Sequence, residues 1–226
     1  MQQLLSQIKI RVNPTIYVKE PESSELGRKI IKESIILINE LGFEQFTIKK
    51  LATSIGTTEG SIYRYFENKH NILLYLVSWF WGFVEYRIVF GVSNLPNCEE
   101  QLNGAMWIII NPLLNLEITK EPDIVSLHKI VIEESAKTYL TRLVDKENDD
   151  GVFSVYKRIC KRISSIILDM NSNYKYPNSL VSVVIEGVLK QLYYKEHLPS
   201  LSDSTSVEKL FDFTQNLLFK TIQQER

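Results

Sequence analysis

The stretch TIKKLATSIGTTEGSIYRYFENK, residues 47–69, decides how this chain is built. Its first half predicts a short helix, because the apolar residues recur at intervals of three and four and so share one face. Thr47 precedes this helix as an N-cap, and Gly56 follows it as the residue that best tolerates a left-handed backbone. Thr58 can cap a second helix that the pattern extends to Tyr65. Two capped helices joined by a glycine turn form a helix-turn-helix.

The second helix of this unit has a composition that suits DNA reading. Its expected outward-facing residues are Glu59, Gly60, Ser61, Tyr63, Arg64 and Tyr65. Such a helix can enter a major groove with its N-terminal end first, and its side chains then reach base edges. Asn68 caps a further helix that starts with Lys69, a cation placed to meet a phosphate. A helix-turn-helix inside an unrelated all-helical protein is the alternative that spacing alone leaves open.

At these residues the chain resembles the TetR family of bacterial repressors. The family pattern combines a threonine-initiated helix, a turn glycine, a short recognition helix ending in tyrosine, and a lysine at the start of the next helix. The residues that fit it are Thr47, Leu51, Ala52, Gly56, Gly60, Ser61, Ile62, Tyr63, Phe66 and Lys69. The resemblance covers residues 26–76, and beyond them only the number and lengths of the helices resemble the family.

The resemblance implies DNA-binding roles for several residues of this unit. The expected DNA-binding residues are Thr47, Lys49, Thr58, Glu59, Gly60, Ser61, Tyr63, Arg64, Tyr65 and Lys69. Lys49 would read or clamp DNA from the first helix, residues 59–61 would approach bases, and Tyr63 and Lys69 are among those that would hold phosphates. Glu59 departs from the basic or neutral residue that the family often has there. An acid at this position either accepts from a cytosine amino group or complements the helix dipole.

Composition sets the class of protein. The chain of 226 residues is 44% hydrophobic and 23% charged, which is typical of a soluble globular protein. Residues 1–80 hold ten Lys and Arg against eight Asp and Glu, a small excess on the side expected to bind DNA. Cys98 and Cys160 lack metal-binding spacing, and neither a signal segment nor a membrane-length apolar run occurs. We expect a cytoplasmic protein with no cofactor, no metal and no membrane partner.

The helical pattern predicts an all-α chain in three parts. Residues 1–22 form an N-terminal arm, 23–67 a three-helix DNA-binding domain, and 68–226 a larger helical domain for ligand binding and dimerisation. The first helix of the DNA-binding domain is expected to end at Gly42. Alternating apolar residues in the arm predict either a short β-hairpin or an extended segment tied against the domain. The basic residues of this arm, Lys9, Arg11 and Lys19, could touch DNA.

Apolar periodicity predicts the helices of the larger domain. They cover 69–92, 98–118, 123–146, 151–170, 177–197 and 205–224. The first of them is unusually aromatic and is expected to link the two domains. Pro112 is expected to kink or break the second, and a gap beside a broken helix can lodge a small hydrophobic or amphipathic ligand. The candidate pocket residues are Trp107, Ile110, Asn111, Leu113, Leu127, His128, Glu133, Tyr139, Arg142, Phe153, Tyr156 and Ile163. Core packing is the simpler explanation for each of these residues taken singly.

The last two predicted helices carry apolar stripes that are wider than packing against one neighbour requires. A four-helix dimer interface would use this excess, and TetR-like proteins build their dimers from their last helices. The expected interface residues are Leu180, Val184, Gly187, Val188, Leu210, Phe213, Thr214 and Leu217. Twofold symmetry would set the two recognition helices about one DNA turn, roughly 34 Å, apart on a near-palindromic site.

Together these features predict a homodimeric, DNA-binding transcriptional regulator. We expect it to be a repressor that a small-molecule ligand releases from its operator. The sequence has no nucleophile elbow, phosphate loop or HExxH motif, so we expect no enzyme and no catalytic residues. The main alternative is a DNA-binding organiser or division regulator that senses no small molecule. An all-helical enzyme or adaptor is a third hypothesis, and it predicts no salt-dependent DNA binding.

Overall fold

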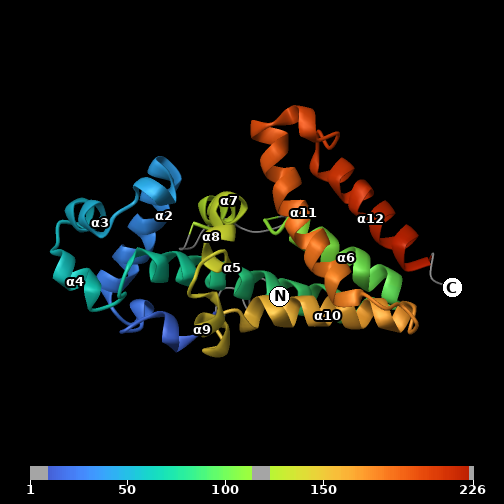
Figure 1. Ribbon diagram of the computed structural model, residues 1–226, viewed down its shortest axis with the longest axis horizontal. Coiled ribbons are helices and arrows are strands. Elements are labelled where there is room, and N and C mark those ends of the chain that lie inside the picture. The colour runs from blue at the N-terminus through green and yellow to red at the C-terminus, as the bar shows by residue number, and fades with distance from the viewer. Residues whose placement is uncertain (1–9, 114–122, 224–226) are drawn as a thin grey trace. The chain divides into compact units, whose positions relative to one another are not determined.

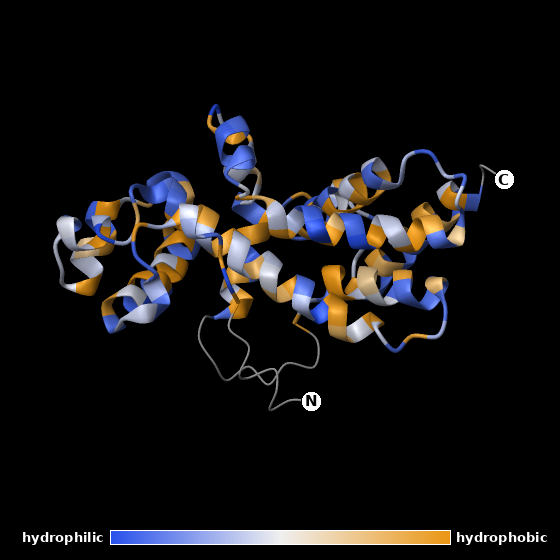
Figure 2. Ribbon diagram, turned by 90° about the horizontal axis from the view of Figure 1, so that it is seen from below, coloured by the Kyte–Doolittle hydropathy of each residue, from blue (hydrophilic) through white to orange (hydrophobic). Residues whose placement is uncertain are grey.

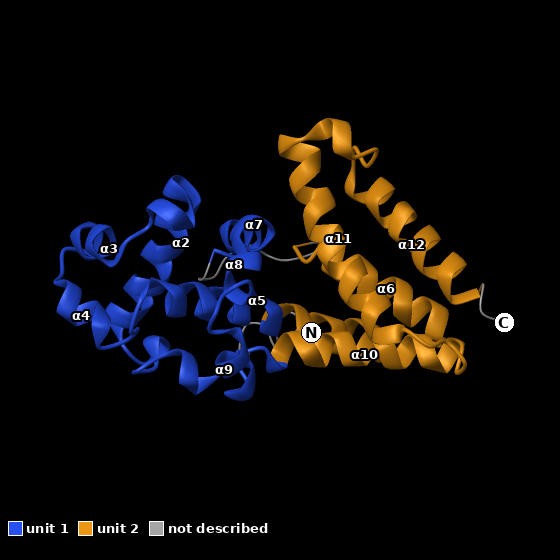
Figure 3. Ribbon diagram, viewed as in Figure 1, with its two compact units in different colours: residues 1–82, 116–154 blue, residues 83–115, 155–226 orange. Residues whose placement is uncertain are grey.

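The computed structural model describes residues 10–113 and 123–223, and every regular element in these residues is helical (Figure 1). The chain divides into two compact units (Figure 3). Unit 1 comprises the described residues of 1–82 and 116–154, and unit 2 those of 83–115 and 155–226. Hydrophobic and hydrophilic stripes alternate around most of the helices (Figure 2), as the apolar periodicity of the sequence predicted. The predicted all-α class is confirmed.

Unit 1 contains the helix-turn-helix. Its helices are α2 (Glu25–Gln45), α3 (Ile48–Ile55), α4 (Glu59–Tyr63), the first part of α5 (Lys69–Val92), α7 (Ile124–Glu134), α8 (Ala136–Tyr139) and α9 (Val144–Asp149). Ser24 caps α2 by accepting from the N–H of Gly27. Gly42 interrupts α2 with a φ of 74°, where the sequence predicted the end of this helix. The fully buried side chains of Ile35, Phe46 and Ile62 lie in the core of this unit.

The described part of the arm, residues 10–22, is extended apart from two short 3-10 helices, η1 (Pro14–Ile16) and η2 (Pro21–Ser23), the second of which ends one residue beyond it. The N–H of Val18 donates to the carbonyl of Tyr65 at 2.8 Å, and Asn71 donates to the carbonyl of Ile16 at 2.9 Å. The arm is therefore tied against unit 1. A β-hairpin is wrong for its described residues, because each proline opens a 3-10 turn where strand pairing would need an N–H donor. Lys9 lies outside the described residues.

Unit 2 consists of the second part of α5, α6 (Cys98–Ile110), α10 (Ser154–Met170), α11 (Pro177–His197) and α12 (Val207–Gln223), with η3 (Pro199–Leu201) between the last two. α6 packs against α11 and α12, where the rings of Trp107 and Phe211 meet edge to face at 5.0 Å. A two-pronged ion pair between Arg158 and Glu85, with both N–O distances at 2.7 Å, joins α10 to α5.

Two predicted helices differ in extent from those that form. α6 ends at Ile110, just before Pro112, which confirms the expected break. The single helix predicted over 123–146 is wrong, because the chain forms α7, α8 and α9 instead. The hydroxyl of Thr138 donates to the carbonyl of Ser135 at 2.6 Å, and that of Thr141 accepts from the N–H of Leu143. Such side-chain bonds compete with the helical ladder and favour turns.

α5 is the one helix in the described chain that is long and apolar enough to cross a membrane by composition. Its residues up to Gly82 belong to unit 1 and those from Phe83 to unit 2. In its most apolar window, 56% of the residues are buried inside the protein. An apolar surface on all sides is what a helix shared by two cores requires, so α5 is a core helix.

Candidate nucleic-acid interface

The local geometry of the helix-turn-helix follows the capping residues that the sequence contains. The hydroxyl of Thr47 accepts from the N–H of Lys50 at 3.2 Å, and that of Thr58 accepts from the N–H of Ser61 at 3.3 Å. Between the two helices Gly56 has a φ of 74° and a ψ of 39°, a left-handed conformation in which a side chain would be strained. Both predicted caps and the predicted glycine turn are confirmed.

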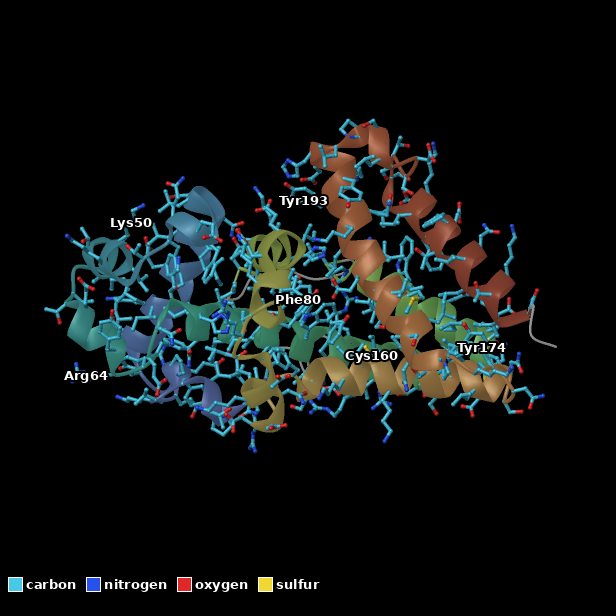
Figure 4. The ribbon with its side chains drawn as sticks, viewed as in Figure 1. Lys50, Arg64, Phe80, Cys160, Tyr174 and Tyr193 are labelled. Atoms are coloured by element: carbon cyan, nitrogen blue, oxygen red, sulfur yellow. The ribbon has the colours of Figure 1, made fainter. Side chains whose placement is uncertain are left out.

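The structure divides the ten predicted DNA-binding residues by exposure. The exposed ones are Thr47, Lys49, Thr58, Glu59, Gly60, Tyr63 and Arg64, whereas Ser61 and Lys69 are half-buried and Tyr65 is buried. Arg64 lies at the end of α4, and Lys50, an exposed lysine that the sequence reasoning did not single out, lies on α3 (Figure 4). Its position beside Lys49 was the signal that could have included it.

Two of the exposed cations have no acidic partner. Within residues 10–113 and 123–223, neither Lys49 nor Arg64 forms an ion pair with a carboxylate. Exposed cations of this kind are the groups that neutralise DNA phosphates. Glu59, the first residue of α4, is exposed as well, so an acidic side chain stands at the end of the helix that would meet the bases.

Tyr65 does not face outward as the sequence predicted. α4 ends at Tyr63, and the N–H of Tyr65 donates to the carbonyl of Ile62 at 2.8 Å, which turns residue 65 into the core. Its side chain is 4% exposed, and its hydroxyl lies 2.7 Å from that of Ser24. The ammonium of Lys19 lies 5.2 Å from the centroid of its ring. The tyrosine therefore fastens the arm to the helix-turn-helix.

Lys69 has protein partners at all three of its N–H groups. Its Nζ lies 3.0, 3.1 and 3.1 Å from the carbonyl oxygens of Phe43, Glu44 and Phe46. Phe43 and Glu44 lie at the end of α2, after its break at Gly42, and Phe46 directly follows α2. A lysine ammonium has three donors, so a phosphate contact by Lys69 would compete with this arrangement. The phosphate role of Lys69 stays a prediction.

The candidate pocket residues are shared between the two units. Leu127, His128, Glu133, Tyr139, Arg142 and Phe153 belong to unit 1, and Trp107, Ile110, Asn111, Leu113, Tyr156 and Ile163 to unit 2. Leu127, Ile110 and Ile163 are buried core residues, and Arg142 is exposed. The ring of His128 stacks on that of Phe80 at 5.3 Å, and burial lowers the pKa of this histidine to about 4. The ligand role of these residues stays a prediction.

The candidate dimer residues fall into an inward and an outward group. Val184, Val188, Leu210 and Thr214 are buried within unit 2, whereas Gly187, Phe213 and Leu217 are exposed and Leu180 is half-buried. Val183, 65% exposed, shares the face of Leu180 and Gly187 by its spacing on α11, although it is not among the candidate interface residues. A Cβ added at Gly187 would meet nothing within 4 Å in this chain. The fold of one chain therefore does not require glycine there.

Comparison with known proteins finds a family whose sequence pattern matches the helix-turn-helix region. The sequence pattern of the bacterial regulatory proteins of the tetR family matches residues 30–76. Over 81 residues the chain is 33% identical to the uncharacterized HTH-type transcriptional regulator YerO of Bacillus subtilis (strain 168). This match covers 36% of the present chain and 26% of that relative, so the chain spans about a quarter of the relative's length.

Solved structures with the same fold match most of the chain. AibR in complex with isovaleryl coenzyme A and operator DNA has a TM-score of 0.59 at 18% identity, and the match covers 85% of this chain and 98% of that one. FadR from Bacillus subtilis in complex with stearoyl-CoA has a TM-score of 0.57 at 18% identity, over 86% and 97%. A regulatory protein in the tetR family from Rhodococcus RHA1 has a TM-score of 0.61 at 9% identity, over 86% and 97%. Residues 30–76 thus match the TetR family of bacterial regulatory proteins, and the all-helical fold of the chain is the one that these solved structures share.

Proposed function

We propose that this chain is a homodimeric, DNA-binding transcriptional repressor that reads a near-palindromic operator and is released by a small hydrophobic or amphipathic ligand. The observation that carries the proposal is the capped pair α3 and α4, which buries Leu51 and Ile62 and exposes Lys49 and Arg64. Phosphate contacts from such cations position a protein on DNA, and base contacts from the recognition helix supply specificity. The match of residues 30–76 to a family of regulatory proteins supports the expectation that the chain is not an enzyme.

A second copy of the chain is the proposed partner in solution. On α11 and α12 the side chains of Val183, Phe213 and Leu217 are 65%, 53% and 40% exposed. Large apolar side chains that remain exposed on two helices are typical of an interface. A twofold axis between two such helix pairs would form a four-helix bundle and would pair the two copies of α4 on one side of a duplex.

The proposed ligand site lies in the part of the chain that follows residue 67. AibR was solved with isovaleryl coenzyme A and operator DNA, and FadR with stearoyl-CoA, so regulators of this fold include proteins that bind acyl thioesters of coenzyme A. This support is an analogy of fold. We accordingly assign 23–67 to DNA binding and 68–226 to ligand binding and dimerisation, while by compactness α7, α8 and α9 belong with the helix-turn-helix in unit 1.

The proposal is tested by selecting bound duplexes from a random DNA pool with the full-length chain. We expect a near-palindromic site whose affinity falls steeply as the salt concentration rises. The Lys49→Ala/Arg64→Ala double variant should lose most of this affinity. Acyl-CoAs and other amphipathic metabolites are then screened for release of the selected duplex. If the chain selects a duplex that no metabolite releases from it, an organiser without a ligand is favoured. If the chain selects no duplex, the proposal that it is a DNA-binding regulator is refuted.

A further inference from the structure

Residues 42–46 are the end of α2 after its break at Gly42, together with Phe46, and they connect the main part of α2 to α3. We call this segment the joint. It starts at Gly42, where the φ of 74° and ψ of 155° break the helical backbone, and it ends at Phe46 directly before the Thr47 cap of α3. Polar groups of a broken helix need partners from elsewhere. The structure provides them from two helices that are distant in sequence.

The first of these partners is Glu134, at the end of α7. Its Oε1 accepts from the N–H of Phe43 at 3.0 Å, although 91 residues separate the two in sequence. The carboxylate is buried, with 6% of the residue exposed. Lys137 lies beside it, with its Nζ 2.6 Å from Oε2 of Glu134 and 3.3 Å from the carboxylate of Glu44. Hydrogen bonds to a charged acceptor are the stronger kind.

The second partner is Lys69, the first residue of α5. Its ammonium donates to the carbonyls of Phe43, Glu44 and Phe46, so the joint receives donors from α5 and an acceptor from α7. Both backbone polar groups of Phe43 are therefore hydrogen-bonded, the N–H to Glu134 and the carbonyl to Lys69. Such a joint has little freedom to change direction while both partners stay in place.

α7 also contacts α2 before the joint. The side chain of Asn39 on α2 donates to the carbonyl of Ser126 on α7 at 3.0 Å, and the two helices pack against each other within unit 1 (Figure 1). α7 is thus bonded to α2 near its own start and to the joint at its own end. A displacement of α7 along its axis would change both bonds together.

We propose that Glu134 is a positioning residue for DNA reading, because its bond to the N–H of Phe43 sets the orientation of α3 and α4 relative to α2. This inference rests on the proposed DNA-binding function. Shortening or removing the carboxylate leaves the Phe43 N–H without its acceptor and lets the joint sample other directions. The two recognition helices of a dimer would then match the spacing of the half-sites less often.

The test measures how variants of the full-length chain bind two duplexes at the same salt concentration. One is the duplex that the natural chain selects, and the other is a duplex of the same length with a shuffled sequence. Glu134→Ala removes the acceptor, and Glu134→Asp keeps the charge but withdraws it from Phe43. Glu134→Gln keeps an oxygen that can accept. Asp145→Ala is the control, because Asp145 is an exposed acid on α9 in the same unit and is not part of the joint.

We expect Glu134→Ala and Glu134→Asp to bind the selected duplex about tenfold more weakly, as the loss of one charged hydrogen bond implies. Their affinity for the shuffled duplex should stay within about twofold, because exposed phosphate contacts do not depend on the joint. Glu134→Gln and Asp145→Ala should bind both duplexes like the natural chain. Amide hydrogen exchange at Phe43 should be faster in the Ala and Asp variants, with no change in the buried part of α5.

Three results would overturn the inference. Unchanged affinity of the Ala and Asp variants for the selected duplex excludes a positioning role, and so does an equal loss on both duplexes, which marks a general loss of folded protein. Unchanged exchange at Phe43 shows that Glu134 does not hold the joint. A natural chain that selects no duplex would refute the proposed function itself. If the natural chain selects a duplex and the Ala and Asp variants bind it equally well, only the role of Glu134 is refuted.

Discussion

The ammonium of Lys69 lies 3.0 Å from the carbonyl oxygen of Phe43 and 4.7 Å from the centroid of the ring of the same residue. One lysine at the start of α5 thus satisfies the end of α2 and covers an aromatic ring of the core. A cation at the carboxyl end of a helix also interacts favourably with the helix dipole. The residue that the sequence pattern assigned to DNA has a structural role in the chain on its own.

Replacing Lys69 by methionine should lower the free energy of unfolding by about 1–3 kcal/mol, because three carbonyls lose a charged donor while the aliphatic stem remains. The measurement is urea unfolding followed by circular dichroism. Lys50→Met is the matched control, since Lys50 is exposed and donates only to the carbonyl of Gln45 at 2.9 Å. That control should change stability by less than about 0.5 kcal/mol. Equal stability of both variants would contradict the structural role of Lys69.

The two tyrosines at the end of α4 should respond differently to loss of the hydroxyl. Tyr63 is 45% exposed, so Tyr63→Phe should leave stability unchanged and weaken binding to every duplex by the loss of one phosphate contact. Tyr65 is buried and bonded to Ser24, so Tyr65→Phe should cost about 1 kcal/mol of stability. Thermal unfolding and DNA titration of both variants check this. Weaker DNA binding by Tyr65→Phe at unchanged stability would contradict the assignment.

Glu59 is expected to determine base preference. Because it is exposed as the first residue of α4, its carboxylate can accept from a cytosine amino group in the major groove. Glu59→Ala should relax the preference at one position of each half-site by about 1–3 kcal/mol and leave non-specific affinity unchanged. Duplex selection with the variant measures this. If the variant selects the same site as the natural chain, the cytosine contact is abandoned and the effect of Glu59 is limited to the helix dipole.

Charges on the outer faces of α11 and α12 should prevent dimer formation. Val183→Glu and Phe213→Glu place a carboxylate where the natural side chains are 65% and 53% exposed, so the folded chain itself should tolerate them. We expect a monomer in analytical ultracentrifugation and a large loss of operator affinity, because only a dimer spans both half-sites. Ile36→Glu on α2, where the residue is 38% exposed, is the control outside unit 2. Variants that stay dimeric would place the interface elsewhere.

His128 should make the protein less stable in acid. Burial lowers its pKa from 6.5 to about 4 in the folded chain, so between these values the unfolded chain binds a proton that the folded chain does not. Stability is therefore lost as the pH falls from 6.5 towards 4, by up to roughly 3 kcal/mol. His128→Phe keeps a ring to stack on Phe80 and should lose this part of the pH dependence. Urea unfolding of both chains at pH 7 and pH 4.5 gives the difference, and parallel pH profiles would contradict it.

The helix-turn-helix could be predicted closely because its determinants are local. Each cap contacts an N–H three residues away, and the turn depends on the backbone freedom of Gly56 alone. The end of α4 could not be placed in the same way. Tyr65 belongs to an apolar and aromatic run that fits one more turn of helix, and only the partner hydroxyl of Ser24, 41 residues earlier, shows why the side chain points inward.

The region between α6 and α10 was predicted least well. Residues 123–146 have the apolar spacing of one long helix, but the hydroxyls of Thr138 and Thr141 bond to nearby backbone and the helix breaks twice. Periodicity averages over a window, whereas these bonds act at single positions. The candidate pocket residues were chosen from the same periodicity, which does not distinguish a residue that lines a cavity from one that fills a core.

The sequence by itself determined the helical class, the two short capped helices and the TetR-type pattern, because caps, turns and amphipathic faces depend on residues within a few positions of one another. The tertiary structure alone decided which polar groups meet across the chain. Glu134 reaches Phe43 over 91 residues and Lys69 reaches the same backbone over 26. No local preference encodes such pairs, since they arise only when packed helices bring distant donors and acceptors within bonding distance.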